Sequence, residues 1–248
     1  MATPYDNSFI EYAAQSSAYS ANAVTTLLVP VLNVSSVLDV GCAAGTWLRF
    51  WGTQGIEDRH GVDGDYVDRT LLEIPQTSFT PQDLNQPFDL GRRFDLVESF
   101  EVAEHVRRES SATFADNLAR HSSRFVLFSA APPGQGGEYH VNERPYEFWR
   151  KLMAERGFVA LDFVRPGILQ DVRISYWYRY NTFLYVRHEY VKDLPPQLAA
   201  AIVPDHVALK DVSPLAFQLR KAVIGMLPFA AQHRIAWLKA RLLPTGRL

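Results

Sequence analysis

The sequence predicts an α/β protein built on a seven-stranded, mostly parallel β-sheet with helices on both faces. From residue 36 to about residue 188, short segments rich in β-branched residues alternate with helical segments, as in chains built from strand–helix units. The 248 residues are 47% hydrophobic and 21% charged, which is ordinary for a globular domain large enough to bury its own core. We therefore expect one main domain with smaller flanking segments.

Strands are expected where β-branched or aromatic runs end at turn residues. In chain order they are Ser36–Val40, Arg59–Asp63, Ser78–Pro81, Phe94–Phe100, Arg124–Ala130, Phe158–Arg165 and Asn181–His188. Helices are expected at Gly45–Gln54, Ser111–His121 and Pro145–Arg156. Proline at the start of the last helix and Gly157 just past its end are typical of helix boundaries.

Two segments of different character flank the main domain, residues 36–190. Residues 1–35 carry Ala- and Ser-rich helical sequence ending at Pro30 and Asn33, and form either an N-terminal helical cap or lid, or a packing helix with no catalytic part. Residues 191–248 begin as a proline-containing connection. They continue as two expected helices, Leu215–Leu227 and Phe229–Leu243, which are separated by Pro228.

The C-terminal extension is basic. From His206 to Leu248 the acidic residue Asp211 stands against seven basic residues, Lys210, Arg220, Lys221, Arg234, Lys239, Arg241 and Arg247. A basic amphipathic segment of this kind either makes a peripheral contact with anionic lipid or a partner, or docks on the domain or on a dimer mate with its charges solvated. The sequence leaves both interpretations open.

Charge and cysteine content exclude several classes of protein. The 25 basic and 27 acidic residues give a net charge of −2, which removes the general attraction on which nucleic-acid binding depends. The single cysteine, Cys42, excludes an internal disulfide and a cysteine-rich zinc module, and favours a reducing compartment. No export signal and no apolar run of about 18 residues is present, so we expect a cytoplasmic protein without a transmembrane segment.

The first strand leads into a turn of small residues that opens a helix. The turn is Gly41-Cys42-Ala43-Ala44-Gly45, preceded by Asp39. Such a turn lets the backbone approach a ligand closely while helix N–H groups point at it. Asp63 closes the second strand 22 residues after Gly41, where an acidic side chain can accept from both hydroxyls of a ribose. Asp83, after the third strand, can accept from an adenine amino group.

These residues resemble the motifs of the class I S-adenosylmethionine-dependent methyltransferases, over roughly residues 36–188. Asp39, Gly41 and Gly45 match that family's acidic-x-Gly-x-Gly-x-Gly turn, and Ala43 replaces its middle glycine. The resemblance implies a Rossmann-like sheet and S-adenosylmethionine as cofactor; a nicotinamide-binding domain is the alternative. It also implies these cofactor contacts: the turn Gly41–Gly45 with Cys42 and Ala43, then Asp63 and Gly64 at the ribose, Asp83 and Leu84 at the adenine, and Phe100 facing the transferable methyl.

A possible metal site follows the fourth strand. Glu101 would share one face with Glu104 or His105 if this segment turns into a helix. The Gly-rich loop after the fifth strand can carry His140 to the same place. These four side chains are candidate ligands for a divalent metal, with Mg²⁺ or Mn²⁺ favoured over Zn²⁺. The alternative is that the glutamates face solvent and His105 packs in the interior.

The Glu-x-x-Glu-His motif resembles two branches of the family, the small-RNA 2′-O-methyltransferases and the quinone-biosynthesis O-methyltransferases. The resemblance implies a metal that grips the acceptor oxygen, which suits an alcohol because its own acidity is low. His140, or His105 if no metal is used, would then be the catalytic proton acceptor.

The acceptor is indicated by polar and aromatic residues after the fifth strand. The segment from Ser175 to Tyr185 is rich in aromatics mixed with Arg and Asn, which suits stacking on a sugar or aryl ring or, alternatively, core packing. The loop before it, with Asn142 and Glu143, resembles bacterial glycan and glycolipid methyltransferases. We predict O-methylation of a sugar hydroxyl. Alternatives are a phenolic or quinone-type acceptor, a non-catalytic cofactor-binding module and, last, small RNA.

Overall fold

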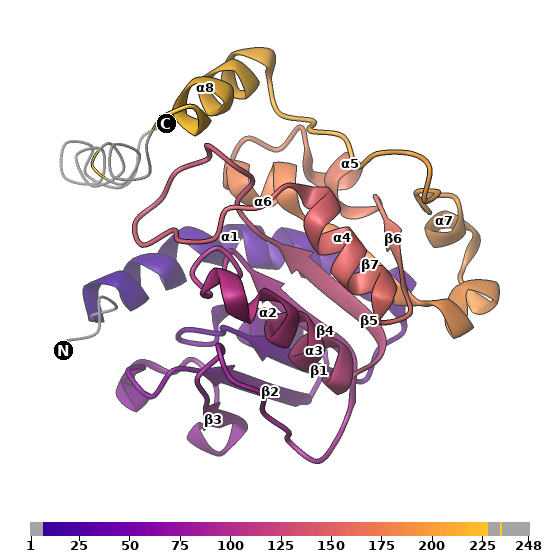
Figure 1. Cartoon of the computed structure of the whole chain (residues 1–248). Helices are drawn as coiled ribbons and strands as arrows, with labels where there is room; N and C mark the ends of the chain where they lie inside the picture. Colours follow the sequence, from indigo (N-terminus) through magenta and orange to yellow (C-terminus); the bar gives the residue numbers. More distant parts are fainter. Residues whose placement is uncertain (1–6, 228–233, 235–248) are drawn as a thin grey trace.

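The computed structural model describes residues 7–227 and residue 234, and its centre is a seven-stranded sheet (Figure 1). The strand order is β3-β2-β1-β4-β5-β7-β6, and β7 runs antiparallel to both of its neighbours while the other paired strands are parallel. The strands are β1 (Ser36–Val40), β2 (Asp58–Asp63), β3 (Phe79–Pro81), β4 (Phe94–Phe100), β5 (Ser122–Ser129), β6 (Phe158–Leu161) and β7 (Phe183–Arg187). This order confirms the predicted mostly parallel, Rossmann-like sheet.

Helices cover both faces because the central strands are apolar on both sides. All five residues of β1 are buried, as expected for a strand inside a parallel sheet. One face is covered by α1 (Asn7–Leu32), α2 (Thr46–Thr53) and α5 (Val164–Ile168), which pack together. The other is covered by α3 (Ser111–His121) and α4 (Tyr146–Glu155).

The sheet has a topological switch point between β1 and β4. From β1 the chain moves outward to β2 and β3, then returns to the other side of β1 to form β4 and β5. Ligands of open α/β sheets bind in the crevice outside the carboxyl ends of the strands at such a point. The turn after β1 and the segment after β4 therefore meet there.

One predicted strand boundary needs correction, and the condition set for residues 101–105 is not met. The sixth strand was expected to reach Arg165, but β6 ends at Leu161 because Asp162 pairs with Arg165 and α5 begins at Val164. The segment 101–105 does not become a helix. Glu101 has a left-handed backbone (φ 53°), and a turn closes between His105 N and Val102 O (2.9 Å).

Short elements fill the remaining connections. The 3₁₀ turns are Arg69–Leu71, Gln76–Ser78, Arg108–Ser110 and His188–Asp193, and the short helices are α6 (Tyr176–Asn181) and α7 (Pro196–Ala199). The last described helix is α8 (Leu215–Gly225), at the top of Figure 1. The predicted helix Phe229–Leu243 lies outside the described residues apart from Arg234. Among the described helices, none is long and apolar enough to cross a membrane.

Candidate active site

The small-residue turn joins β1 to α2 in a left-handed conformation. Gly41 has φ +90°, and a Cβ there would lie 2.4 Å from Val102 Cγ2, so only glycine fits. Ala43 also has a positive φ of 47°, the left-handed conformation that the expected glycine would adopt without strain. Gly45 (φ 82°) is the N-cap of α2. The free N–H groups of this helix start therefore face the switch point.

Asp63 braces the turn from the end of β2. Its Oδ2 accepts from Ala43 N (2.7 Å), and its Oδ1 accepts from Gly64 N (2.7 Å) and from the Tyr66 hydroxyl. Burial raises the pKa of Asp63, and these three donors act in the opposite direction. The carboxylate is thus held by its own chain on both oxygens.

A second buried acidic pair lies under the turn. Asp39 of β1 is in register with Glu98 of β4, and both are buried. Glu98 Oε2 accepts from Trp51 Nε1 (2.8 Å), while its Oε1 has no hydrogen-bond partner among the described residues. Burial raises the pKa of each well above its usual value, and Asp39 raises that of Glu98 further. Burial also raises the pKa of the Cys42 thiol, so Cys42 is a packing residue and not a nucleophile.

Asp83 and Leu84 follow β3 at the same edge of the sheet. Asp83 is exposed, and its Oδ1 accepts from the backbone and side-chain nitrogens of Asn85 (both 2.9 Å). Leu84 is half-buried against the core on the α3 and α4 side. Gln82 N donates to Asp63 O (2.7 Å), so this loop starts directly beside the Asp63 backbone.

Three aromatic rings close the switch point from the α1 side of the sheet. Phe100 at the end of β4 stacks on Trp47 of α2, with ring centroids 3.6 Å apart. Tyr178 of α6 meets both rings edge-on, at 5.1 and 5.7 Å. Phe100 was predicted from the sequence as a site residue, but Trp47 was not. The position of Trp47 in the first turn of α2, directly after the glycine turn, could have indicated that it belongs to the site. The trio forms an apolar wall beside the glycine turn.

Beyond this wall, Glu104, His105 and His140 come together. One ligand atom from each lies within 4.8 Å of the others, and this is the group of possible metal ligands in the described part of the chain. Glu104 is fully buried, and neither of its carboxylate oxygens has a hydrogen-bond partner among the described residues. His140 Nε2 lies 4.0 Å from Glu104 Oε1, and the two imidazole rings are perpendicular with centroids 4.9 Å apart.

The protonation of this cluster is strongly perturbed. Burial raises the pKa of Glu104 well above its usual value, and the Glu101 charge raises it further. Burial lowers the pKa of His105 to about 3, and His140 contributes in the same direction. His105 is therefore a neutral imidazole at physiological pH, the form in which histidine binds a metal.

Glu143 organises the loop that brings His140 to the cluster. Its oxygens accept from Gly134 N and Gly136 N (both 2.7 Å), and His140 Nδ1 donates to Glu143 Oε1 (2.9 Å). In a neutral imidazole, this bond places the proton on Nδ1 and the lone pair on Nε2, which lies 4.0 Å from Glu104 Oε1. This role of Glu143 was not predicted from the sequence. Its spacing of three residues from His140 was a signal, but the closure onto the two glycines could not be read from it.

Glu101 belongs to a neighbouring network instead of the three-residue cluster. Its oxygens accept from Gln135 Nε2 (2.9 Å) and Asn181 Nδ2 (3.2 Å), and Asn181 also donates to Gln135 Oε1 (2.9 Å). Tyr146 donates to Asn181 Oδ1 (2.8 Å). Of the four predicted ligands, the structure thus gathers three and holds Glu101 beside them through amides.

Comparison with known proteins agrees with this architecture. A family model described as a methyltransferase domain matches residues 12–132. No curated protein matches the sequence. The fold is similar to magnesium protoporphyrin IX methyltransferase from Synechocystis with bound S-adenosylmethionine, at 20% identity over 75% of this chain and 86% of that chain (TM-score 0.51).

Two sugar-modifying proteins have similar folds. One is a sugar N-methyltransferase from Streptoalloteichus, at 18% identity over 71% of this chain and 87% of that chain (TM-score 0.51). The other is an amino pentose methyltransferase from Micromonospora echinaspora with bound S-adenosylmethionine, at 15% identity over 75% and 99% of the two chains (TM-score 0.51). At these identities the likeness establishes the fold.

The family match spans the glycine turn, Asp63 and the end of β4, and the fold around them is that of the matched family. The chain is an S-adenosylmethionine-dependent methyltransferase with a Rossmann-like fold. It is accordingly an enzyme that uses S-adenosylmethionine.

Proposed function

We propose that this methyltransferase is an O-methyltransferase that acts on a sugar hydroxyl with the help of a divalent metal. The observation that carries the proposal is the Glu104 carboxylate. Both of its oxygens are buried and lack hydrogen-bond partners in the described chain, yet two imidazoles stand beside them. An unpaired buried carboxylate is costly, and a cation bound by Glu104, His105 and His140 would remove that cost.

The donor set favours one metal within the predicted pair. Two nitrogen ligands and one oxygen ligand lie between the preference of Mg²⁺ for oxygen and that of Zn²⁺ for nitrogen and sulfur. Mn²⁺ fits best. The Glu143 carboxylate, which accepts from His140 Nδ1, is the kind of outer partner that fixes a ligating imidazole and makes it more basic.

The cofactor is proposed to lie over the turn Gly41–Gly45, with Phe100 near the transferable methyl and Asp83 and Leu84 at the adenine. Asp63 Oδ2 accepts only from Ala43 N among the described residues, which leaves room for one ribose hydroxyl. A second ribose hydroxyl could bind Asp63 Oδ1 only by displacing the Tyr66 hydroxyl, which donates to that oxygen in the structure. The N–H groups of α2 face the methionine end.

The proposed chemistry divides between the bound groups and the chain. When bound, S-adenosylmethionine supplies an electrophilic methyl group, and the metal supplies a positive charge that makes an alcohol more acidic. Glu104, His105 and His140 hold the metal, and the aromatic trio keeps water from the transfer path. If no metal is used, His140 Nε2 is the proton acceptor, because Glu143 fixes the tautomer that leaves its lone pair available.

A sugar acceptor is supported by the polar groups around the cluster. Gln135 and Asn181 place amides next to Glu101, so hydrogen-bonding side chains adjoin the cluster. A polyhydroxylated ring can use more of these groups than a flat phenol can. Two proteins with similar folds are, by their descriptions, sugar methyltransferases.

Metal binding is tested by titrating Mn²⁺ calorimetrically into the metal-stripped protein. We expect one site in the wild type and none in Glu104→Gln. Glu109→Gln is the matched control, because Glu109 is an exposed glutamate five residues away. Equal Mn²⁺ binding by wild type and Glu104→Gln contradicts the assigned site.

The acceptor class is tested by offering glycosides and catechols with labelled S-adenosylmethionine, with and without EDTA. Transfer to glycosides that EDTA abolishes and Mn²⁺ restores is the expected result. Transfer to catechols alone overturns the sugar acceptor. Transfer that survives exhaustive chelation overturns the metal and leaves His140 or His105 as the base.

A further inference from the structure

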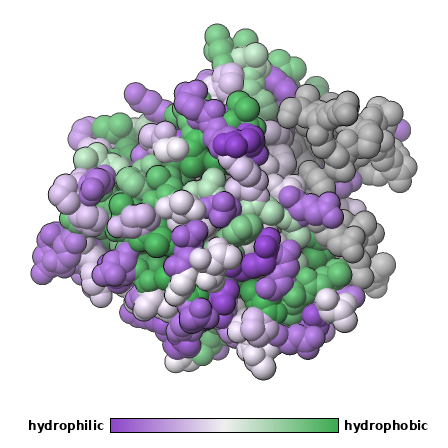
Figure 2. Space-filling model, turned by 180° about the vertical axis from the view of Figure 1, so that it is seen from behind, coloured by the Kyte–Doolittle hydropathy of each residue, from purple (hydrophilic) through white to green (hydrophobic). Residues whose placement is uncertain are grey.

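Helix α8 exposes a stripe of large apolar side chains, although Phe217 of the same helix packs inward against Tyr176 and Tyr180. The side chains with large exposed fractions are all apolar: Leu215 (71%), Leu219 (60%), Val223 (62%) and Met226 (82%). They recur at intervals of four, four and three residues, so they form one stripe along the helix. Figure 2 shows this apolar surface at the top of the molecule, over α8.

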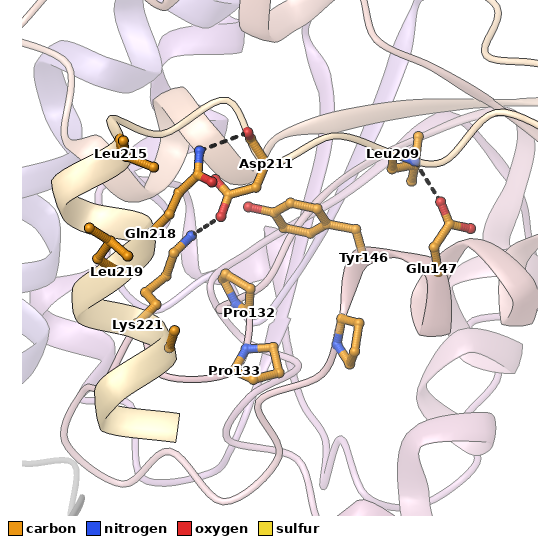
Figure 3. Close-up of a pocket in the computed structure, with 12 residues that line it drawn as sticks. Pro132, Pro133, Tyr146, Glu147, Leu209, Asp211, Leu215, Gln218, Leu219 and Lys221 are labelled. Carbon is orange, nitrogen blue, oxygen red and sulfur yellow. Dashed lines mark hydrogen bonds and ion pairs between the residues drawn. The ribbon is translucent and has the colours of Figure 1, made fainter. Parts of the chain in front are cut away.

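The polar side chains of α8 point toward the protein. Lys221 is only 5% exposed and forms an ion pair with Asp211. Gln218 donates to the carbonyls of Asp211 (3.2 Å) and Ser213 (2.7 Å), and Arg220 donates to Gln135 O (3.4 Å). Figure 3 shows Gln218 and Lys221 pointing from one side of α8 toward Asp211. The orientation of α8 is therefore fixed by bonds, and the apolar stripe faces outward as a consequence.

The helix is also held tightly against the loop after β5. A Cβ at Gly134 would lie 2.0 Å from Lys221 O, so the two backbones are in direct contact. Leu215 and Leu219 line a cavity of about 520 Å³ between α8, the prolines Pro132 and Pro133, and the start of α4 (Figure 3). The outward stripe is thus continuous with an apolar hollow in the surface.

Charge decides between the occupants that could cover this face. From residue 206 to the end, seven basic residues stand against Asp211, and Lys221 neutralises that carboxylate. The sequence after Leu227 adds Arg234, Lys239, Arg241 and Arg247 and no acidic residue. A second copy would bring two strongly positive segments together, whereas an anionic lipid surface complements both the charge and the apolar stripe.

We propose that the outward face of α8 docks on an anionic lipid surface. The stripe of Leu215, Leu219, Val223 and Met226 enters the boundary between headgroups and acyl chains, and the net positive charge of the C-terminal sequence favours anionic lipid over neutral lipid. This is peripheral binding and needs no membrane-spanning segment. It is independent of the metal and of the acceptor proposed above.

The test is flotation of the full chain with vesicles of phosphatidylcholine containing phosphatidylglycerol, against phosphatidylcholine alone. We expect binding to the anionic vesicles that weakens as salt is added. The double variant Leu219→Glu/Met226→Glu should reduce partitioning by about tenfold or more, because two apolar anchors are replaced by charges. Val172→Glu is the matched control, since Val172 is 77% exposed but lies far from α8 in sequence, and its binding should equal that of the wild type.

Circular dichroism and the melting temperature show whether the double variant folds as the wild type does. Absence of wild-type binding to anionic vesicles at low salt overturns the proposal, and so does equal binding by the double variant. A wild-type dimer in sedimentation velocity that the double variant lacks, without vesicle binding, overturns it in favour of a second copy. A lowered melting temperature of the double variant, again without vesicle binding, overturns it in favour of coverage by the chain itself.

Discussion

Asp63 and Glu104 are two buried carboxylates at the same edge of the sheet, and their surroundings differ completely. Asp63 accepts hydrogen bonds from Ala43 N, Gly64 N and the Tyr66 hydroxyl, so both of its oxygens are satisfied by the chain. Glu104 is more deeply buried, and neither of its oxygens has a partner among the described residues.

This difference separates what the fold supplies from what must be added. Asp63 stabilises the loops of the cofactor site, because its donors come from the turn after β1 and from the segment after β2. Glu104 has no comparable set of donors: the backbone groups of Glu104 and Ala131 lower its pKa, but burial and Glu101 raise it well above its usual value. A proton or a cation would therefore stabilise this buried carboxylate. Glu98 is intermediate, since Trp51 satisfies one oxygen and the other has no partner.

The largest expected effect comes from removing the Glu104 charge. Glu104→Gln keeps the shape of the side chain but binds a divalent metal poorly. We predict that turnover falls about a thousandfold while S-adenosylmethionine affinity stays the same. Steady-state kinetics and calorimetric titration of the cofactor measure the two quantities. Full activity would mean that Glu104 resembles Asp63 after all and serves structure alone.

The next effect concerns Asp63. Asp63→Ala removes three hydrogen bonds that hold the two cofactor loops, together with the proposed ribose contact. We predict a loss of about 2–3 kcal/mol in S-adenosylmethionine binding, accompanied by a lower melting temperature. Calorimetry and thermal unfolding report these losses separately. Reduced stability with unchanged affinity would show that Asp63 braces the loops without touching the ribose.

A smaller effect is expected at Glu143, which acts on the metal through His140. Glu143→Gln keeps a side-chain oxygen but not the charge that orients the imidazole. We predict that Mn²⁺ affinity falls about 10–100-fold. Calorimetric titration measures the Mn²⁺ affinity of this variant. The control is Glu138→Gln, because Glu138 is a half-buried glutamate of the same loop. A loss of the same size in both variants would point to general loosening of the loop.

The smallest effect is a pH-dependent change in stability at Glu98. Burial raises the pKa of Glu98, so its carboxyl keeps a proton in the folded protein that it releases at about pH 4.3 in the unfolded chain. The free energy of unfolding therefore decreases as pH rises above that value. Glu98→Gln should be more stable than the wild type by about 1 kcal/mol at neutral pH, with a smaller difference in acid. Urea unfolding at two pH values tests this.

The sheet was predictable because each central strand is an apolar run bounded by turn residues, as in Ser36–Val40 and Phe94–Phe100, whose predicted bounds are those observed. The sixth strand was predicted too long because the Asp162–Arg165 pair, which starts α5, cannot be distinguished from a strand end by composition. The glycine turn was readable since its positive backbone angles need small residues.

The candidate site was only partly predictable, for a physical reason. Glu104, His105 and His140 were named from spacing, but the separation of Glu101 depends on its left-handed backbone and on Gln135 and Asn181, which lie far away in the sequence. The role of Glu143 depends on a loop that closes on itself. Long-range contacts of this kind leave no periodic signal in the sequence.

The position of β7 also determines the order in which the sheet can be completed during synthesis. β6 hydrogen-bonds to β7 and, through Ala160 and Leu161, to residues 202 and 203, all of which follow it in the chain. A nascent chain that ends before residue 183 therefore has an unpaired edge on β5 and a β6 segment with no strand to join. Such edges are prone to aggregate. Of the seven strands, the last to leave the ribosome is thus the one that completes the sheet.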